Sequence, residues 1–427
     1  MTVADRKIPA SREGEPSSGR RELRASIKRS EDSHPEDELL LRYIRTFMGF
    51  ERGAAPQVAA VRGVDWEGLF ERADRQKVLP LLYMAIKRSD DDQVPQEWLN
   101  RLRAEFDRNA IFNLSMTGEL LGLLDLFEGR GIEAIPFKGP SLSSLLYRDI
   151  SLRQFLDLDV LVPLDRVSEV RDLLISRGYV PSRQMRPAEE RAHIRYQHHH
   201  HFYSPDRGIN LEIHWRISPR IYSFDLEPSE LRRRAKLVRI AGREVLSLSP
   251  EDTILILCEH ATRHYWRRLA WICDVAALAA SDEVEWKTAV QRARDLGCER
   301  VLFVGLLLAE ELLKAPIPSE ISGMLGEDET ASSLAAEAVE MLFGDRSPPC
   351  GSADRLGSSI GEELFYIRAR ERLRDRSLYY LRRATYPTEE DWDRISLPED
   401  LSFLYRLMRP FRMIGKYRLA IWKWFLR

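Results

Sequence analysis

One short segment near the middle of the chain combines an apolar strand pattern with two acids. Residues 155–162 read Phe-Leu-Asp-Leu-Asp-Val-Leu-Val, so aliphatic residues surround Asp157 and Asp159. This pattern predicts a buried β-strand, on which residues two apart point to the same face. Two carboxylates this close are unfavourable without a cation between them, and Mg²⁺ prefers oxygen ligands. The alternative is that the acids face solvent or cap the following turn.

A second predicted strand precedes the aspartates and leads into a tight turn. Residues 131–141 read Gly-Ile-Glu-Ala-Ile-Pro-Phe-Lys-Gly-Pro-Ser, which predicts a short strand, a turn at Gly139 and the start of a helix. A glycine allows close backbone approach, and a helix N-terminus offers N–H groups to an anion. Lys138 adds a positive charge for phosphate, and Arg153 could pair with an acid or a phosphate. A plain strand-to-helix turn is the alternative.

A third carboxylate lies on a later predicted strand. Residues 209–215 alternate in strand fashion after a Pro-Asp-Arg-Gly turn, as part of a predicted hairpin around residues 198–216, and Glu212 and His214 share one face. If this strand pairs beside the aspartate strand, Glu212 completes a cluster of three carboxylates. Three carboxylates can hold two metal ions, one at the attacking oxygen and one at the triphosphate. His214 could orient a ligand, act as a base or donate a hydrogen bond inside the core.

The hydrophobic pattern divides the chain into four parts. Residues 1–36 are rich in Arg, Ser, Glu and Pro, which predicts a disordered tail. Residues 37–128 predict helices, residues 129–248 carry the strands, and residues 249–427 predict helices again. We therefore expect an α+β fold, in which a small mixed sheet is flanked by N- and C-terminal helical segments.

Two helices are predicted in more detail. The segment 111–127 has apolar residues at helical spacing, which predicts a buried stripe. The residues of this stripe are Ile111, Leu114, Leu120, Leu121, Leu124 and Phe127. Farther along, Ser249 is expected to cap a helix that has Pro250 in its first turn.

Histidines gather in two places. His198–His201 form a run of four, of which only two could join one site on a strand; the favoured interpretation is an exposed or edge strand. Residues 258–274 predict a single helix with His260 and His264 on one face. Without the glutamate of an H-E-x-x-H motif this is not a protease zinc site. A mixed core and surface helix is favoured over contact with a nucleotide base or acceptor.

Composition limits the possible classes of function. With 427 residues the chain can hold two or three domains, and its net charge of −2 predicts no stable nucleic-acid partner. Four cysteines lack C-x-x-C spacing, so neither a zinc ribbon nor a disulfide framework is indicated. The longest apolar run, residues 301–309, is too short to span a membrane, and the N-terminus has no apolar signal core. A cytoplasmic location is the default expectation.

The C-terminal segment allows two interpretations. Residues 405–427 hold seven Arg or Lys and no acid, interleaved with apolar residues, as in a helix on a membrane surface. Pro410 and Gly415 interrupt a single amphipathic face. A terminal helix packed on the domain is therefore favoured over membrane contact.

These motifs together resemble the nucleotidyltransferase fold of the DNA polymerase β type. The closer resemblance is to the bacterial family described as uncharacterised nucleotidyltransferases, in which a Lys-Gly turn, a Tyr, an Arg, an Asp-x-Asp strand and an acid-x-His-Trp strand follow in order. The matching residues are Lys138, Gly139, Tyr147, Arg153, Asp157, Asp159, Glu212, His214 and Trp215. The wider superfamily more often has Asp at the position of Glu212, and Pro140 interrupts its Gly-Ser signature.

The resemblance implies an enzyme that binds an NTP with Mg²⁺ or Mn²⁺ and transfers a nucleoside monophosphate to an acceptor hydroxyl or phosphate. Asp157 and Asp159 would hold both metal ions, and Glu212 would help to hold the one that activates the acceptor. The expected nucleotide-binding residues are Lys138, Gly139, Ser141, Arg153 and His214. One alternative is a nucleotide- or partner-binding module without turnover. Another is a peripheral component of a surface-glycan or peptide biosynthesis system.

Overall fold

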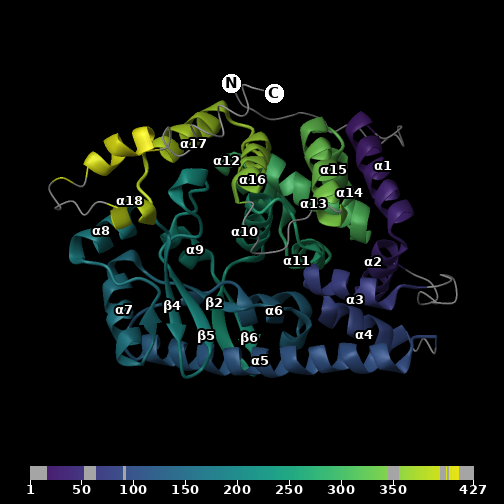
Figure 1. The fold of residues 1–427 in the computed structure, drawn as a ribbon, viewed down its shortest axis with the longest axis horizontal. Helices are drawn as coiled ribbons and strands as arrows, with labels where there is room; N and C mark the ends of the chain where they lie inside the picture. Colours follow the sequence, from purple (N-terminus) through teal and green to yellow (C-terminus); the bar gives the residue numbers. More distant parts are fainter. Residues whose placement is uncertain are drawn as a thin grey trace.

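Helices surround one small mixed sheet in this protein (Figure 1). The computed structural model describes residues 17–51, 64–89, 93–344, 355–394, 401 and 403–412. Within these ranges the strands form a five-stranded sheet and a separate two-stranded hairpin. The α+β class predicted from the sequence is confirmed.

The N-terminal part is helical. Its helices are α1 (Ser18–Ser33), α2 (Pro35–Phe47), α3 (Trp66–Arg75), α4 (Leu79–Ser89) and α5 (Gln96–Glu128). Helix α1 packs against α15 (Glu329–Phe343), and Arg20 and Arg24 pair with Glu311 at 2.8 and 3.0 Å. Residues 18–33 therefore form a packed helix rather than part of a disordered tail, because Leu23 is buried there. Residues 1–16 lie outside the described residues.

The five-stranded sheet has the order β1-β2-β5-β4-β3. Its strands are β1 (Ile135–Pro136), β2 (Asp157–Leu161), β3 (Val180–Pro181), β4 (His199–Ser204) and β5 (Ile209–His214). Strands β2 and β5 are parallel, and the other neighbours are antiparallel. Helices α6 (Gly139–Tyr147) and α7 (Val167–Ser176) lie between successive strands in the sequence. The predicted hairpin of β4 and β5 is present, and β2 and β5 pair side by side, which was the condition for a cluster of three carboxylates.

Alternation along β2 and β5 separates an apolar face from a polar one. Leu158, Val160, Leu211 and Ile213 are buried in a core cluster that also contains residues of α5 and α7. The residues between them, including the acids, point to the other face because strand side chains alternate. The apolar face thus anchors the sheet on α5, and the acids are left facing the C-terminal helices.

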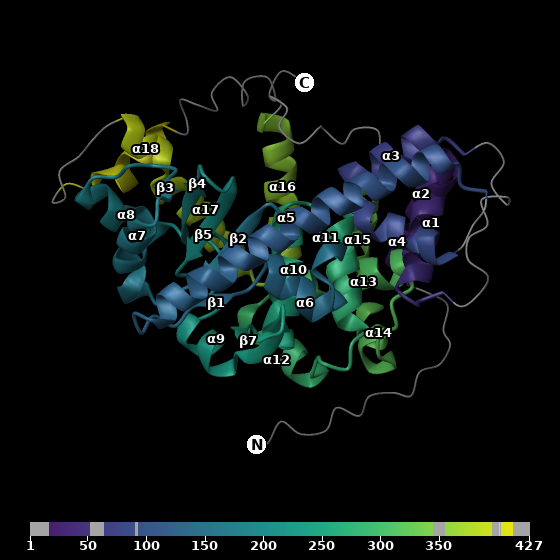
Figure 2. The ribbon, with the colours of Figure 1, turned by 90° about the horizontal axis from the view of Figure 1, so that it is seen from below.

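Helix α5 runs along the base of the molecule, beneath both the sheet and the N-terminal helices (Figures 1 and 2). Leu120 and Phe127 are buried on it as predicted, but Ile111 and Leu114 are 71% and 62% exposed. The predicted stripe is wrong at these two positions because the buried face there passes through Asn113. The Asn113 side chain donates hydrogen bonds to two backbone carbonyls in the segment before β2.

The same helix has the length and composition of a membrane-spanning helix, although the sequence predicted none. Polar residues interrupt the apolar stretch of α5, so its apolar character is apparent only in the mean hydropathy along the helix. Its most apolar window is 44% buried in the structure. A helix in the core of a protein can have the same length and apolar composition.

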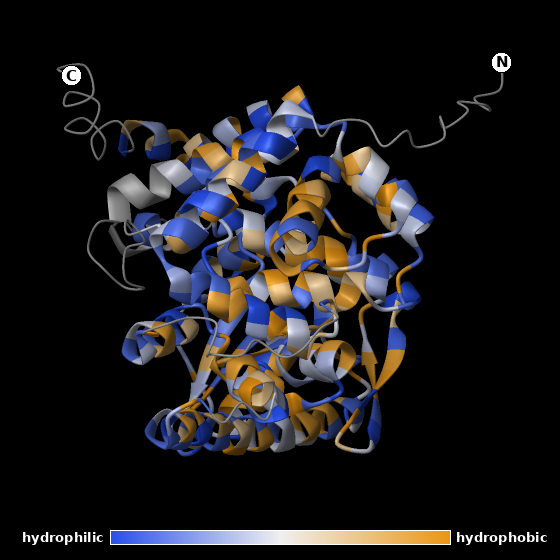
Figure 3. Cartoon of the chain, turned by 90° about the vertical axis from the view of Figure 1, so that its right-hand side faces the viewer, coloured by the Kyte–Doolittle hydropathy of each residue, from blue (hydrophilic) through white to orange (hydrophobic). Residues whose placement is uncertain are grey.

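The C-terminal part is again mainly helical. Helix α8 (Pro187–Tyr196) lies between β3 and β4 in the sequence. The elements that follow β5 are α9 (Pro228–Arg234), β6 (Lys236–Ile240), β7 (Arg243–Ser247), α10 (Pro250–Arg263), α11 (Leu269–Ala279), α12 (Trp286–Leu296), α13 (Glu299–Leu313), α14 (Ser319–Leu325), α15, α16 (Arg355–Ala369), α17 (Leu373–Thr385) and α18 (Glu389–Arg394). Helix α10 begins as predicted, because the Ser249 hydroxyl accepts the N–H of Asp252. Apolar residues gather toward the interior of this part, and hydrophilic residues are frequent on its outer helices (Figure 3).

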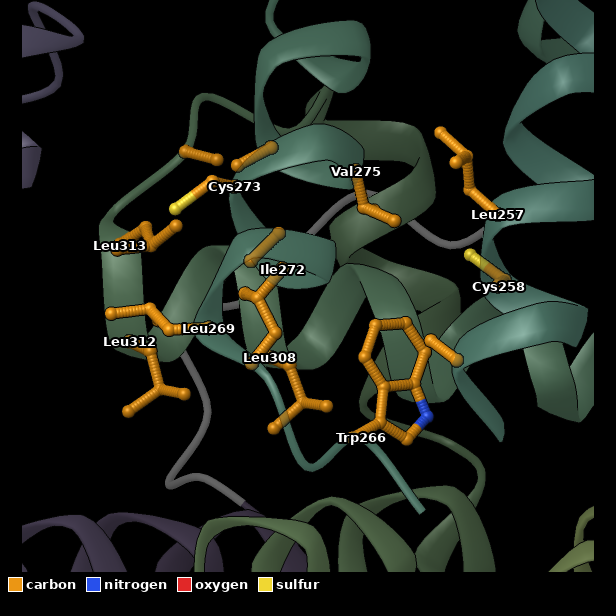
Figure 4. Close-up of a cluster of buried hydrophobic side chains, with 14 of the residues drawn as sticks. Leu257, Cys258, Trp266, Leu269, Ile272, Cys273, Val275, Leu308, Leu312 and Leu313 are labelled. Atoms are coloured by element: carbon orange, nitrogen blue, oxygen red, sulfur yellow. The ribbon is translucent and has the colours of Figure 1, made fainter. Parts of the chain in front are cut away.

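The single helix predicted over residues 258–274 is broken into α10 and α11. Tyr265 and Trp266 have φ angles of 59° and 52°, a left-handed conformation that ends a helix. The break places the fully buried Trp266 ring among apolar side chains that include Cys258 and Leu308 (Figure 4). Burial of this large ring offsets the backbone strain.

Residues 404–412 are helical, and Arg409 is buried in an ion pair with Asp391 at 2.8 Å. The rest of the predicted C-terminal helix lies outside the described residues.

Candidate active site

The polar face of β2 and β5 forms the candidate site. Asp157 pairs with Asn210, Asp159 with Glu212, and Leu161 with His214 in the parallel register. Directly opposed residues share a face, so Asp159 and Glu212 lie next to each other. Helix α11 packs against α6, and on α10 burial, followed by the nearby charge of Lys138, lowers the pKa of His260.

Asp159 lies at the centre of the charged groups and is only 1% exposed. The Lys138 ammonium donates to its Oδ1 over 3.0 Å. His214 Nε2 lies 3.2 Å from the same oxygen and 3.1 Å from Glu212 Oε2. Two basic side chains therefore converge on Asp159, and His214 bridges the two carboxylates.

The side chains of Lys138, Asp159, Glu212 and His214 stabilise one another's charged forms. Burial alone would raise the pKa of Asp159, but Lys138 and His214 outweigh burial and lower it below the usual range. Burial alone would lower the pKa of His214, yet its hydrogen bonds to Asp159 and Glu212 raise it overall. Burial alone would raise the pKa of Glu212, but the hydrogen bond from His214 helps to lower it overall. The resulting state pairs two carboxylates with two cations.

Asp157 has a different environment from Asp159. Burial, and then the negative charge of Asp159, raise its pKa to about 6. It is half-buried and lies nearer the start of β2. Asp157 therefore carries its charge less readily than its neighbour.

The geometry fits a cation beside Asp159. One ligand atom each from Asp159, Glu212 and His214 lie within 4.8 Å of one another. Among the described residues, Asp159 Oδ2 is buried without a hydrogen-bond partner, which is costly for a carboxylate oxygen unless a cation takes it. Asp157 does not belong to this trio, whereas the sequence predicted Asp157, Asp159 and Glu212. Because Glu212 and His214 are two residues apart on one strand, their shared face was the signal from which His214 could have been predicted as a metal ligand.

Gly139 is required for the close approach of the turn to β2. Its φ is +56°, and a Cβ there would lie 3.3 Å from the backbone oxygen of Asp157. The predicted role was backbone approach to phosphate; the observed close neighbour is the aspartate strand. Lys138 precedes this glycine and is the N-cap of α6.

Ser141 does not face the acids. Its side chain is fully buried, and its hydroxyl lies 2.7 Å from the hydroxyl of Ser247 on β7. The predicted contact with a triphosphate is therefore corrected, because the first turn of α6 directs this residue toward the β6–β7 hairpin.

Arg153 pairs with an acid that the strand pattern did not assign to the site. Its Nε donates to Asp274 Oδ2 over 2.9 Å, and the Tyr147 hydroxyl donates to Oδ1 over 3.0 Å. Burial raises the pKa of Asp274 in spite of Arg153. Arg153 was expected to pair with an acid or a phosphate; its partner is an acid, Asp274 on α11, which lies outside the predicted set of strand carboxylates.

The histidine run contributes two residues to the site. The favoured interpretation of an exposed or edge strand is wrong, because β4 lies between β5 and β3. His199 pairs with His214 in the register, and its Nε2 lies 3.9 Å from Glu212 Oε1. His198 Nε2 lies 3.0 Å from His199 Nδ1, and His200 points to the opposite, buried face.

The Asp-x-Asp strand thus pairs with the acid-x-His strand beside the Lys-Gly turn, the three motifs on which the resemblance in sequence rests. The chain belongs to the family described as uncharacterised nucleotidyltransferases, whose model matches residues 62–314, more than half of the chain. No curated protein matches it in sequence. A solved antigenic nucleotidyltransferase-like protein from Paracoccidioides brasiliensis is 15% identical, with 48% of this chain and 95% of that one covered and a TM-score of 0.26.

Proposed function

We propose that the protein is a metal-dependent nucleotidyltransferase that moves a nucleoside monophosphate from an NTP to an acceptor hydroxyl or phosphate. The observation that carries the proposal is the parallel register of β2 and β5, which sets Asp159 opposite Glu212. Asp157 follows on the same face, and Lys138 lies beside them at the N-terminus of α6. Membership of the family supports the class of enzyme.

The carboxylates supply the oxygen ligands that Mg²⁺ or Mn²⁺ prefers. Asp159 and Glu212 would hold the ion, with Asp157 as a further oxygen donor. The bound ion would neutralise phosphate charge and make the acceptor oxygen more nucleophilic. The free buried oxygen of Asp159 supports this role.

The basic groups position the charges of the substrate. Lys138 is 22% exposed, so its ammonium can reach a phosphate from the helix N-terminus. His214 holds a proton at Nε2 between the two carboxylates and keeps them in place. The reaction then depends on in-line positioning and charge neutralisation.

A second candidate function is nucleotide binding without turnover. One observation favours it: Lys138 and His214 already neutralise Asp159, where a metal ion would act. An ion would have to compete with both groups. Affinity for divalent metal therefore separates the two candidates.

The test is transfer of label from α-labelled NTPs. The purified protein is incubated with each NTP, Mg²⁺ or Mn²⁺, and a cell extract as the source of acceptor. Metal-dependent labelling that is lost in Asp159→Asn and kept in Asp165→Asn, an exposed matched control, would support the enzyme. Binding of NTP without transfer would support the second candidate, and neither binding nor transfer would reject both.

A further inference from the structure

We propose that His198, His199 and His214 form a metal site for a transition-metal ion of the Zn²⁺ type. One ring nitrogen from each histidine lies within 4.8 Å of the other two. The ring centroids of His199 and His214 are 5.1 Å apart, and those of His198 and His214 are 5.5 Å apart. Three imidazoles thus converge at the edge of the candidate active site.

The spacing suits tetrahedral coordination. Zn–N bonds of about 2.1 Å at tetrahedral angles put neighbouring ligand nitrogens roughly 3.4 Å apart. The two nitrogens of His198 lie 3.0 and 3.3 Å from Nδ1 of His199. Glu212 Oε2 lies 3.1 Å from His214 Nε2 and forms its cluster with Asp159, so water or a substrate atom would take the fourth position of the histidine site.

Hydrogen bonds to the backbone position two of these histidines, His214 and His198. His214 Nδ1 lies 3.3 Å from the carbonyl of Arg216, so Nε2 would bind the metal after the ion displaces the proton that it holds. Ligating histidines commonly use the second ring nitrogen in this way. The carbonyl of His198 accepts the N–H groups of Trp215 and Arg216, which fixes its backbone beside the end of β5. The hairpin therefore presents the cluster before any ion binds.

Imidazole ligands give the histidine cluster a different metal preference from the acids of β2. Nitrogen donors favour Zn²⁺ and its neighbours, whereas all-oxygen sets favour Mg²⁺. The cluster shares His214 with the candidate active site, but the inference does not depend on nucleotide transfer.

The test uses Co²⁺ as a spectroscopic substitute for Zn²⁺ with the untagged, full-length protein. We expect visible absorption bands of tetrahedral intensity that saturate at about one equivalent and disappear when Zn²⁺ is added. His198→Gln and His199→Gln should each weaken Co²⁺ binding roughly tenfold or more. His201→Gln is the matched control: it lies on the same strand outside the cluster and should bind Co²⁺ like the parent. Far-ultraviolet circular dichroism checks the fold of each variant.

The outcome separates this inference from the proposed function. Co²⁺ bands that persist in Asp157→Asn, together with loss of Mg²⁺-dependent transfer, would support both. Absence of the bands, or bands unchanged in both His198→Gln and His199→Gln, would overturn the histidine site even if transfer is observed. Bands without any transfer would leave the histidine site standing and count against the nucleotidyltransferase.

Discussion

Lys138 and Asp159 form an ion pair of 3.0 Å, in which the aspartate is 1% exposed and the lysine 22%. The pair joins the turn before α6 to strand β2. The lysine can therefore leave the aspartate for a phosphate, while the aspartate cannot leave the sheet. This asymmetry makes Lys138 a group that both metal and nucleotide would influence.

Replacement of Lys138 by alanine should change metal and nucleotide affinity in opposite directions. Loss of a charge-assisted contact to phosphate should weaken NTP binding roughly tenfold. Loss of the competing cation should strengthen Mg²⁺ or Mn²⁺ binding, because Asp159 Oδ1 is released. Isothermal titration calorimetry measures both affinities, and Lys287→Ala on the distant helix α12 is the control. Weaker metal binding in the variant would contradict the assigned role.

Gly139→Ala should destabilise the protein more than Gly131→Ala. Both glycines have positive φ, +56° and +64°, so both variants carry backbone strain of about 1 kcal/mol. Only at Gly139 would the new Cβ also meet the backbone of β2, at 3.3 Å from the oxygen of Asp157. Urea unfolding should show an additional loss of about 1 kcal/mol there. Equal losses in the two variants would show that the close approach to β2 is unimportant.

Removal of one partner of the buried Arg153–Asp274 ion pair should strongly lower the free energy of unfolding. Their side chains are 13% and 1% exposed, so Asp274→Ala leaves a buried guanidinium without its carboxylate. We expect a loss of about 3 kcal/mol in unfolding free energy. The exposed pair of Arg101 and Glu67 is the comparison, and Glu67→Ala should cost less than about 1 kcal/mol. A double-mutant cycle with Arg153→Met measures the coupling; a coupling near zero would reject the pair as a structural link.

Buried histidines should make the protein sensitive to acid. Burial lowers the pKa of His200 to about 3, while an unfolded histidine titrates near 6.5. The unfolded chain therefore binds a proton at His200 more readily than the folded protein does. The contribution of neutral His200 to the free energy of unfolding is complete above pH 6.5 and is lost as pH falls toward 3. Each such residue contributes up to roughly 1.4 kcal/mol per pH unit.

His200→Phe should reduce this pH dependence. Among the described residues, His200 Nε2 is buried without a hydrogen-bond partner, so an apolar ring of similar size should be accepted. Urea midpoints at pH 7 and pH 5 should differ less in the variant than in the parent. An identical pH dependence would show that His200 titrates as it does in the unfolded chain.

The sequence predicted those parts of the site that depend on local periodicity. A period of two along β2 and β5 placed Asp157 with Asp159, and Glu212 with His214, on shared faces. The Ser249 cap and the β4–β5 hairpin followed from residues close together in the chain.

Only the tertiary structure decided which groups meet. Arg153 finds Asp274 across 121 residues, and Lys138 reaches Asp159 from another element; neither contact has a local pattern. Ser141 turns toward the β6–β7 hairpin for the same reason, since packing of α6 determines which way its first turn faces. Periodicity determines the face of a strand on which a side chain lies, but long-range packing and charge pairing determine what lies opposite that face.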